Sequence, residues 1–229
     1  MAFIYYNFYL SLSTIIIIKT QKLNCEKNLM IEETIQNLLG DSLREGISTE
    51  EIETVELLLG VKLPSPLKYM YSKVGNDPLF MSSFLYFYPI EDLVLLDNKI
   101  QFLEENQDVC RWAFDIDDTD HPKVYQQADD EKWYLLDKMP LEKFLSDILY
   151  YQCAMGYDFG AEVLLERGRL FGILDSDWDK VVSFDGLYIY RKQDALIWYL
   201  SDDNMVRDVY YSSPNEETLN QHKQLFCLK

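Results

Sequence analysis

The polar residues that could do chemistry gather in one short stretch in the middle of the sequence. They are Asp115, Asp117, Asp118, Asp120, His121, Asp129 and Asp130. Carboxylates at this spacing can hold a divalent cation, or act as a nucleophile and a proton-transfer group. They can equally form a solvated turn between strands, or present negative charge to a basic partner. The sequence around the cluster indicates which of these roles is favoured.

The run from Asp115 to Thr119 fits the D-x-D-x-T pattern of haloacid-dehalogenase-type phosphotransferases. In such enzymes the first Asp attacks phosphorus, the second handles protons, and magnesium bridges the reacting groups. The pattern must follow the first parallel strand of a Rossmann-like sheet. Here it lies mid-chain among short strand-like runs, with no crossover helix behind it. A magnesium-dependent phosphotransferase that uses Asp115 and Asp117 is therefore kept as the lower alternative.

Other catalytic patterns are missing from the sequence. The two histidines, His121 and His222, belong to no Ser-His-Asp or Cys-His arrangement. There is no glycine-rich phosphate loop, EF-hand frame or Cys/His cluster. The widely spaced cysteines predict free thiols in a reducing cytoplasm. We therefore expect a cytoplasmic protein that is not an enzyme and that needs neither a metal nor a cofactor.

The charge balance indicates the kind of partner. The chain has 39 Asp and Glu against 21 Lys and Arg, a formal net charge of -18 among 229 residues. A negative potential of this size repels nucleic-acid phosphates and anionic membranes, and it attracts basic proteins. An acidic surface also serves solubility alone. We expect a basic protein partner, no nucleic acid and no membrane, and the sequence leaves the oligomeric state open.

The first 29 residues differ from the rest of the chain. Phe3 to Ile18 is rich in Ile and Tyr, and Lys19, Lys22 and Lys27 follow it. The order of charge and apolar residues is not that of a secretory signal. The run is also too short and too often interrupted by polar residues for a membrane span. We interpret residues 1–29 as an extension outside the domain, with a mis-called start and Met30 as the true first residue.

Helical patterns begin after Met30. Apolar spacing predicts helices over 31–39, from about 49 to Leu59, and over 67–73. Ser48 and Glu51 match a capping box, and Ser65 before Pro66 predicts a second N-cap. A long amphipathic helix is expected over about 140–155, capped by Gly156. A C-terminal helix is expected after Ser213-Pro214.

Strand-like runs fill most of the remaining sequence. They lie at 84–88, 100–103, 109–116, 124–126 and 133–135, and again at 181–184, 187–190, 195–200 and 206–211. Few of them are separated by a helix, so an antiparallel or mixed sheet is favoured over a doubly wound one. We predict an α+β fold with N-terminal helices packed on a mixed, largely antiparallel sheet. Residues 30–229 would form a single domain with a strand-rich C-terminal extension.

Two stretches resemble the SUKH superfamily. The first runs from Leu58 through Leu63-Pro64-Ser65-Pro66 to Asn76-Asp77-Pro78, and it is similar to the N-terminal signature of that family. The second runs from Phe102 through Glu105-Asn106-Gln107 to Trp112 and Asp115, and it is similar to the family's strand pair. Asp108 departs from this pattern, where a Gly is common. Together the stretches cover about residues 30–155.

The resemblance implies an α+β fold and a role as an immunity protein. Such proteins bind and neutralise a bacterial toxin domain, often a nuclease, by occluding its active site. A regulatory or scaffold module without a toxin remains an alternative, because the fold alone does not prove immunity.

Partner binding is assigned to acidic and aromatic residues on the sheet side. Carboxylates can compete for the basic groove with which a nuclease grips phosphates. Aromatic residues in strands are commonly part of the core, but an exposed one would anchor an interface. Trp178 is expected to be exposed, because polar residues surround it in the sequence. The candidate site residues are Trp112, Asp115, Asp117, Asp118, Asp120, Asp129, Asp130 and Trp178.

Overall fold

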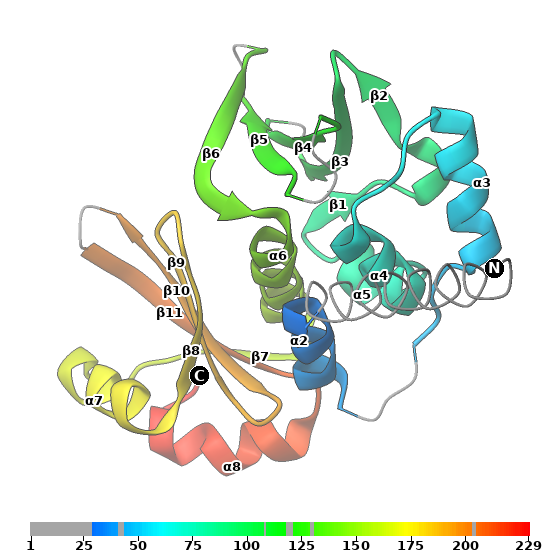
Figure 1. Ribbon diagram of the computed structural model, residues 1–229. Helices are drawn as coiled ribbons and strands as arrows, with labels where there is room; N and C mark the ends of the chain where they lie inside the picture. Colours follow the sequence, from blue (N-terminus) through cyan, green and yellow to red (C-terminus); the bar gives the residue numbers. More distant parts are fainter. Residues whose placement is uncertain (1–28, 41–43, 108, 118–120, 129–130, 203–204) are drawn as a thin grey trace, which may run out of the picture.

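The computed structural model confirms the α+β class. It describes residues 29–229 apart from 41–43, 108, 118–120, 129–130 and 203–204. Within these residues seven α-helices and two antiparallel sheets alternate in layers (Figure 1). The first sheet packs on a group of helices, the second sheet packs on the opposite side of the same group, and two further helices cover the second sheet.

The first two N-terminal helices end where the sequence predicts, the third ends one residue later, and the short fourth helix was not predicted. They are α2 (Leu29–Leu39), α3 (Thr49–Leu59), α4 (Ser65–Val74) and the short α5 (Pro78–Ser82). The capping box at the start of α3 is confirmed, since Ser48 Oγ accepts from the Glu51 amide and Glu51 accepts from the Ser48 amide. Gly60 ends α3 in the left-handed conformation, with φ 71°. Ser65 is not an N-cap, because α4 begins at Ser65 itself and Pro64 precedes it without a side-chain bond.

The first sheet is an antiparallel meander. Its strands are β1 (Leu85–Phe87), β2 (Val94–Leu96), β3 (Lys99–Glu105), β4 (Arg111–Asp115), β5 (Lys123–Gln127) and β6 (Trp133–Pro140). They run in the order β1-β3-β4-β5-β6, and β2 pairs with another part of β3. The 3-10 helix η1 (Ile90–Asp92) leads into β2. Asp97 and Asn98, both at positive φ, close the tight β2–β3 hairpin.

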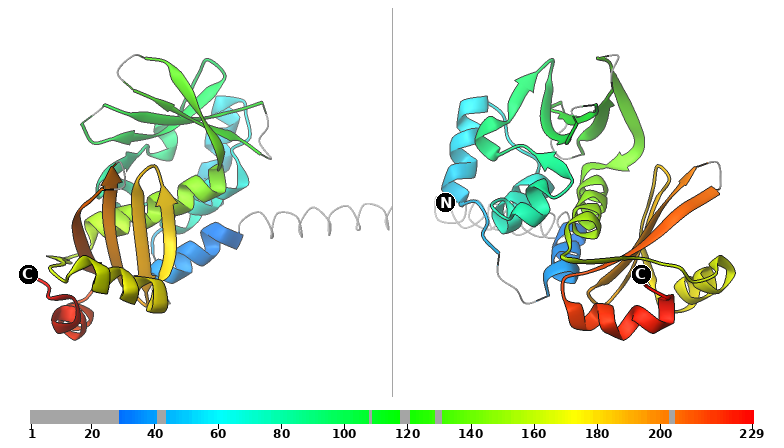
Figure 2. Two further views of the ribbon diagram at one scale, coloured as in Figure 1. Left: turned by 90° about the vertical axis from the view of Figure 1, so that its left-hand side faces the viewer. Right: turned by 180° about the vertical axis from the view of Figure 1, so that it is seen from behind.

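Helix α6 (Leu141–Gly156) lies at the centre of the molecule. It contacts α2, α4 and α5 and strands of both sheets, and Figure 2 shows it crossing between them. Its buried positions include polar residues such as Ser146, Asp147 and Gln152, so the burial extends beyond one apolar stripe. The predicted cap at Gly156 is displaced by one residue, because Tyr157 is the C-cap.

The second sheet comes from the strand-rich C-terminal part of the chain. Its strands are β7 (Phe159–Glu162), β8 (Asp179–Phe184), β9 (Leu187–Lys192), β10 (Ala195–Asp202) and β11 (Met205–Ser213), in the order β7-β11-β10-β9-β8. Helices α7 (Arg167–Asp177) and α8 (Glu216–Phe226) complete the fold. The sequence pattern missed α7, and Asn215 rather than Ser213 caps α8 by accepting from the Thr218 amide.

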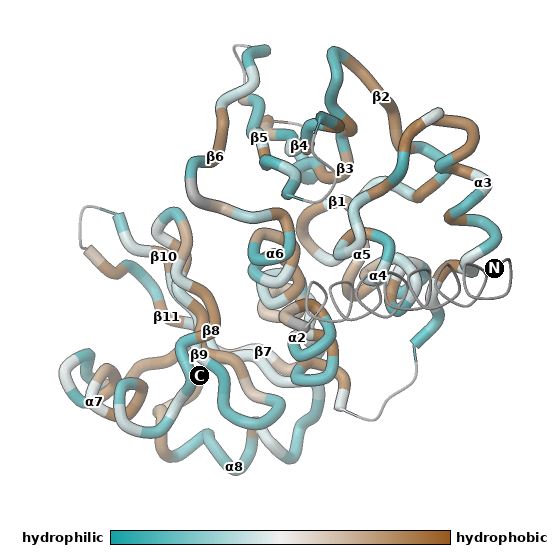
Figure 3. Tube along the Cα trace, viewed as in Figure 1, coloured by the Kyte–Doolittle hydropathy of each residue, from teal (hydrophilic) through white to brown (hydrophobic). Residues whose placement is uncertain are grey.

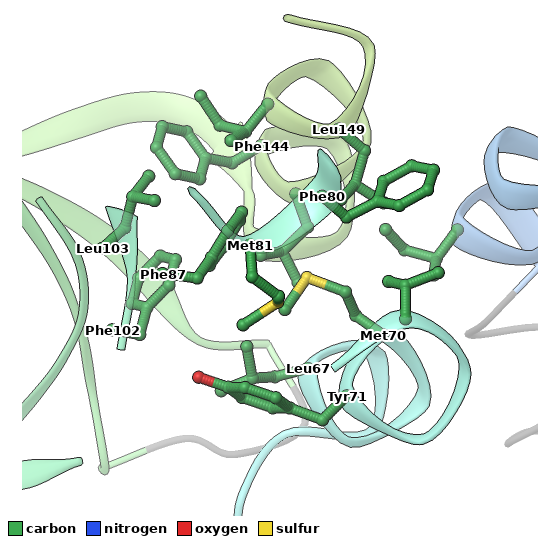
Figure 4. Close-up of a cluster of buried hydrophobic side chains, with 14 of the residues drawn as sticks. Leu67, Met70, Tyr71, Phe80, Met81, Phe87, Phe102, Leu103, Phe144 and Leu149 are labelled. Carbon is green, nitrogen blue, oxygen red and sulfur yellow. The ribbon is translucent and has the colours of Figure 1, made fainter. Parts of the chain in front are cut away.

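Two hydrophobic clusters hold the layers together. The larger one surrounds Phe102, Phe144 and Leu149 and extends through Met70 and Phe80 of the helices (Figure 4). It continues into the second sheet through Val182, Leu187, Ile189 and Leu196. The smaller cluster lies between that sheet and α7 and α8. Alternate residues of β10 serve the two clusters, so both faces of the second sheet are covered.

No helix among the described residues has the length and apolar character that crossing a membrane requires.

Candidate functional site

The carboxylate of Asp115 is turned into the protein. Asp115 ends β4, pairs in register with Lys99 of β3, and is 7% exposed. The Tyr125 hydroxyl donates to its carboxylate at 3.3 Å, and the Lys123 amide donates at 3.4 Å. The side chain therefore joins β4 to β5, and it does not present its charge to solvent.

The groups around Asp115 form a polar corner of the first sheet. The Lys99 ammonium lies 4.4 Å from the centre of the Tyr125 ring. Burial raises the pKa of Tyr125, and the nearby charge of Asp115 raises it further. Asp117 is exposed, and it accepts a hydrogen bond from the Asn98 side chain in the β2–β3 turn. Of this pair of acids, Asp117 alone is available to a partner.

The phosphotransferase interpretation finds no support in the arrangement of this corner. Asp115 follows a strand of an antiparallel meander, whereas the D-x-D-x-T pattern needs a parallel strand in front of it. Within the described part of the chain, no group of three or more His, Cys, Asp or Glu is placed to hold a metal ion. The other predicted acids, Asp118, Asp120, Asp129 and Asp130, lie outside the described residues.

Trp112 lies on the inner side of the first sheet. Its ring is half-buried and packs on Phe144 of α6, with 6.1 Å between the ring centroids. Its indole Nε1 is buried and, among the described residues, has no hydrogen-bond partner. The ring faces α6, so the prediction that Trp112 anchors a partner is not supported by its position. Strand alternation places it beside the core.

The expectation that Trp178 is exposed is wrong. Trp178 directly follows α7 and is 7% exposed. Its ring packs edge-on against Phe226 of α8, at 5.5 Å, and lies 5.7 Å from His222. The polar residues beside it in the sequence point outward, while the indole fills the gap between α7 and α8. His222 of α8 is half-buried and bonds through Nδ1 to the Tyr211 hydroxyl.

A different surface combines exposed aliphatic side chains with carboxylates. It is formed by α3, η1 and β2, and we call it the acidic–apolar face. Its members are Leu57, Leu58, Glu91, Asp92, Val94 and Leu96, all exposed. This surface was not predicted from the sequence, although the sequence contains a signal for it. Leu57-Leu58-Leu59 and Val94-Leu95-Leu96 are runs of three apolar residues, and neither a helix at its 3.6-residue period nor a strand at period two can direct all three inward.

Comparison of the chain with protein-family models, with curated proteins and with solved structures found no match. The likeness to the SUKH superfamily therefore rests on the motifs quoted above.

Proposed function

We propose that this chain is an immunity protein of the SUKH type. It binds a basic toxin domain, a nuclease, in the cytoplasm of the producing cell and blocks the active site of that toxin. The proposal is supported by the resemblance of the sequence motifs and by the order of N-terminal helices followed by an antiparallel meander.

The proposal depends on the position of the few basic residues. Lys62 and Lys68 pair with the buried Glu56, at 2.6 and 3.1 Å from its carboxylate oxygens. In the same way Arg44 pairs with Asp77 and Lys143 with Asp147, whose side chains are 6% and 1% exposed. Cations that neutralise buried carboxylates cannot neutralise the surface. The buried acids among the described residues are Glu56, Asp77, Asp115 and Asp147, so the other described acids, which exceed the cations, lie at or near the surface.

A displayed negative potential fits inhibition of a nucleic-acid-binding enzyme. A nuclease must direct Lys and Arg toward phosphates, and the same groove attracts an acidic protein. Charge steering of this kind raises association rates by about 10- to 1000-fold and weakens as salt is added. The inhibitor then acts by occupying the groove, and it needs no chemistry of its own.

The test is rescue of growth. The product of the reading frame adjacent to the gene is expressed in cells with and without this chain. We expect that product to be toxic alone and harmless together with the chain, and the purified pair to bind with an affinity that falls steeply with salt. A toxic product that this chain neither rescues nor binds would overturn the proposal.

The enzyme alternative is tested with the same purified protein. Turnover of p-nitrophenyl phosphate with magnesium is measured for the natural chain and for Asp115→Asn. We expect no turnover in either. Turnover that vanishes with Asp115→Asn would favour the phosphotransferase. Absence of both rescue and turnover would leave the scaffold role.

A further inference from the structure

We propose that the acidic–apolar face is the docking surface, and that it takes a basic, amphipathic segment of a protein partner. This inference rests on the proposed function for the existence of that partner. It places the contact on α3, η1 and β2, next to the Asp115 corner, because Leu96 of β2 lies opposite Lys99, which in turn pairs with Asp115.

The first support is the degree of exposure of four aliphatic side chains. Leu57 and Leu58 are 83% and 81% exposed, and Val94 and Leu96 are 54% and 64% exposed. A single exposed leucine needs no explanation, whereas several on neighbouring elements mark a surface that another molecule covers. Burying a leucine or valine side chain is among the largest favourable contributions that one residue makes to association.

The second support is that the elements that carry these side chains are neighbours in the fold. Helix α3 contacts η1, and β2 begins two residues after η1 ends. Figures 1 and 2 show α3 beside β2 from opposite sides, and Figure 3 shows apolar stretches on both elements. Leu59 and Leu95, which neighbour the exposed residues in sequence, pack on the core. Both α3 and β2 are therefore anchored in the hydrophobic core next to their exposed residues.

The third support is the sign of the charge around the aliphatic residues. The segments 49–59 and 90–98 contain no Lys or Arg; the neighbouring cations are Lys99, which lies opposite Leu96, and Lys62, which pairs with Glu56. Their exposed carboxylates are Glu50, Glu51, Glu53, Glu91, Asp92 and Asp97. A second copy of this chain would bring like charges together, which disfavours self-association. A segment with leucines on one side and lysines or arginines on the other can pack on the aliphatic side chains of the face and pair with its carboxylates.

The region that holds Leu200 and Met205 provides a comparison. These residues are 49% and 69% exposed near the end of the β10–β11 pair. Their surroundings include Arg207, which pairs with Asp202 at 3.8 Å. Because this site has an apolar pair but a neutralised acid, it serves as a matched control for the acidic–apolar face.

The direct test uses a synthetic helical peptide with a leucine face and a lysine face. It is titrated into the full ¹⁵N-labelled chain, and backbone amide shifts are followed by NMR. We expect shifts that concentrate in 49–59 and 90–98. A peptide of the same charge with serine in place of leucine should bind about tenfold more weakly, because it retains steering but loses apolar contact. Shifts concentrated elsewhere, or none at all, would overturn the proposal.

Variants separate the apolar contribution from the charge. The double substitution Leu57→Ser with Leu58→Ser should raise the dissociation constant about tenfold or more, while Leu200→Ser with Met205→Ser leaves it unchanged. Glu91→Gln with Asp92→Asn should reduce the salt dependence of binding. Asp175→Asn with Asp177→Asn removes as much charge from the exposed end of α7 and should reduce it less. Equal effects of target and control variants would overturn the assignment.

The outcomes for the surface and for the function can be told apart. If rescue from the toxin survives Leu57→Ser with Leu58→Ser and the peptide maps elsewhere, the surface is wrong and the immunity role stands. If no toxin is found but the peptide maps to 49–59 and 90–98, the surface stands and the immunity role fails. Sedimentation of the full chain tests whether a second copy of the chain covers the face instead. A dimer that dissociates when Leu57→Ser and Leu58→Ser are introduced would assign the face to a second copy and overturn the proposal.

Discussion

Replacing Gln152 should remove a large part of the stability of the fold. Its side chain, on α6, is fully buried and hydrogen-bonds the backbone of α5, of β1 and of the residues that join them. Nε2 donates to the carbonyls of Phe80 and Leu85 at 3.0 and 2.6 Å. Oε1 accepts from the amides of Phe84 and Leu85 at 3.0 and 2.9 Å. One side chain therefore bonds four backbone groups.

The substitution Gln152→Met keeps the length of the side chain and removes its hydrogen-bonding groups. Leaving a buried donor or acceptor without a partner costs at least about 1 kcal/mol. The four groups together predict a loss of about 4 kcal/mol, against the ~5–15 kcal/mol by which a domain is commonly stable.

Urea unfolding, followed by tryptophan fluorescence and circular dichroism, measures this loss. With a slope of about 2.5 kcal/mol per molar urea, the midpoint should fall by roughly 1.5 M. The control is Gln221→Met on the exposed side of α8, which should change stability by less than about 0.5 kcal/mol. A loss below about 1 kcal/mol for Gln152→Met would refute the reasoning, because the backbone groups would then have found other partners.

Three further perturbations test other parts of the fold. Glu56→Gln should cost about 1–3 kcal/mol in urea unfolding. Burial raises the pKa of Glu56, but bonds from Lys62 and Lys68 outweigh it and the net shift is downward from 4.5. Its contribution is therefore present above pH 4.5 and lost as the pH falls through the lowered pKa, so Glu56→Gln should flatten the acid side of the stability profile. Trp178→Ala should cost about 3–5 kcal/mol in calorimetry, and an unchanged melting temperature would contradict its place in the core. Burial and a nearby lysine lower the pKa of His222 from 6.5, so its NMR titration midpoint should lie below that value, and stability should fall as the pH drops below 6.5 in the natural chain but less in His222→Gln.

Local signals in the sequence predicted most of the elements. The capping box of Ser48 and Glu51 and the turn at Gly60 depend on residues within a few positions, and both are present. Helix α7 was missed because Gly168 and Gly172 weaken its helical pattern. Its buried residues are Leu170 and Leu174, which are too few for a clear stripe.

The features that were predicted wrongly depend on contacts that are distant in sequence. Trp178 is buried because α8, from the end of the chain, packs on it. Asp115 is withdrawn from solvent by its pairing with β3 and by the Tyr125 hydroxyl of the next strand. The C-terminal strands other than β7 were predicted, but their assembly into a separate sheet on the far side of α6 was not. Strand patterns alone do not determine which sheet a strand joins.

The position of α6 between the two sheets has a consequence for how the chain can be divided. Phe144 contacts Phe102 and Trp112 of the first sheet and Phe184 of the second, so one ring serves both halves. A fragment that ends at Gly156 would keep the helix but expose the side that the second sheet covers, and a fragment that begins there would lose its central support. We expect neither half to survive limited proteolysis without the other, so the molecule should melt as one cooperative unit.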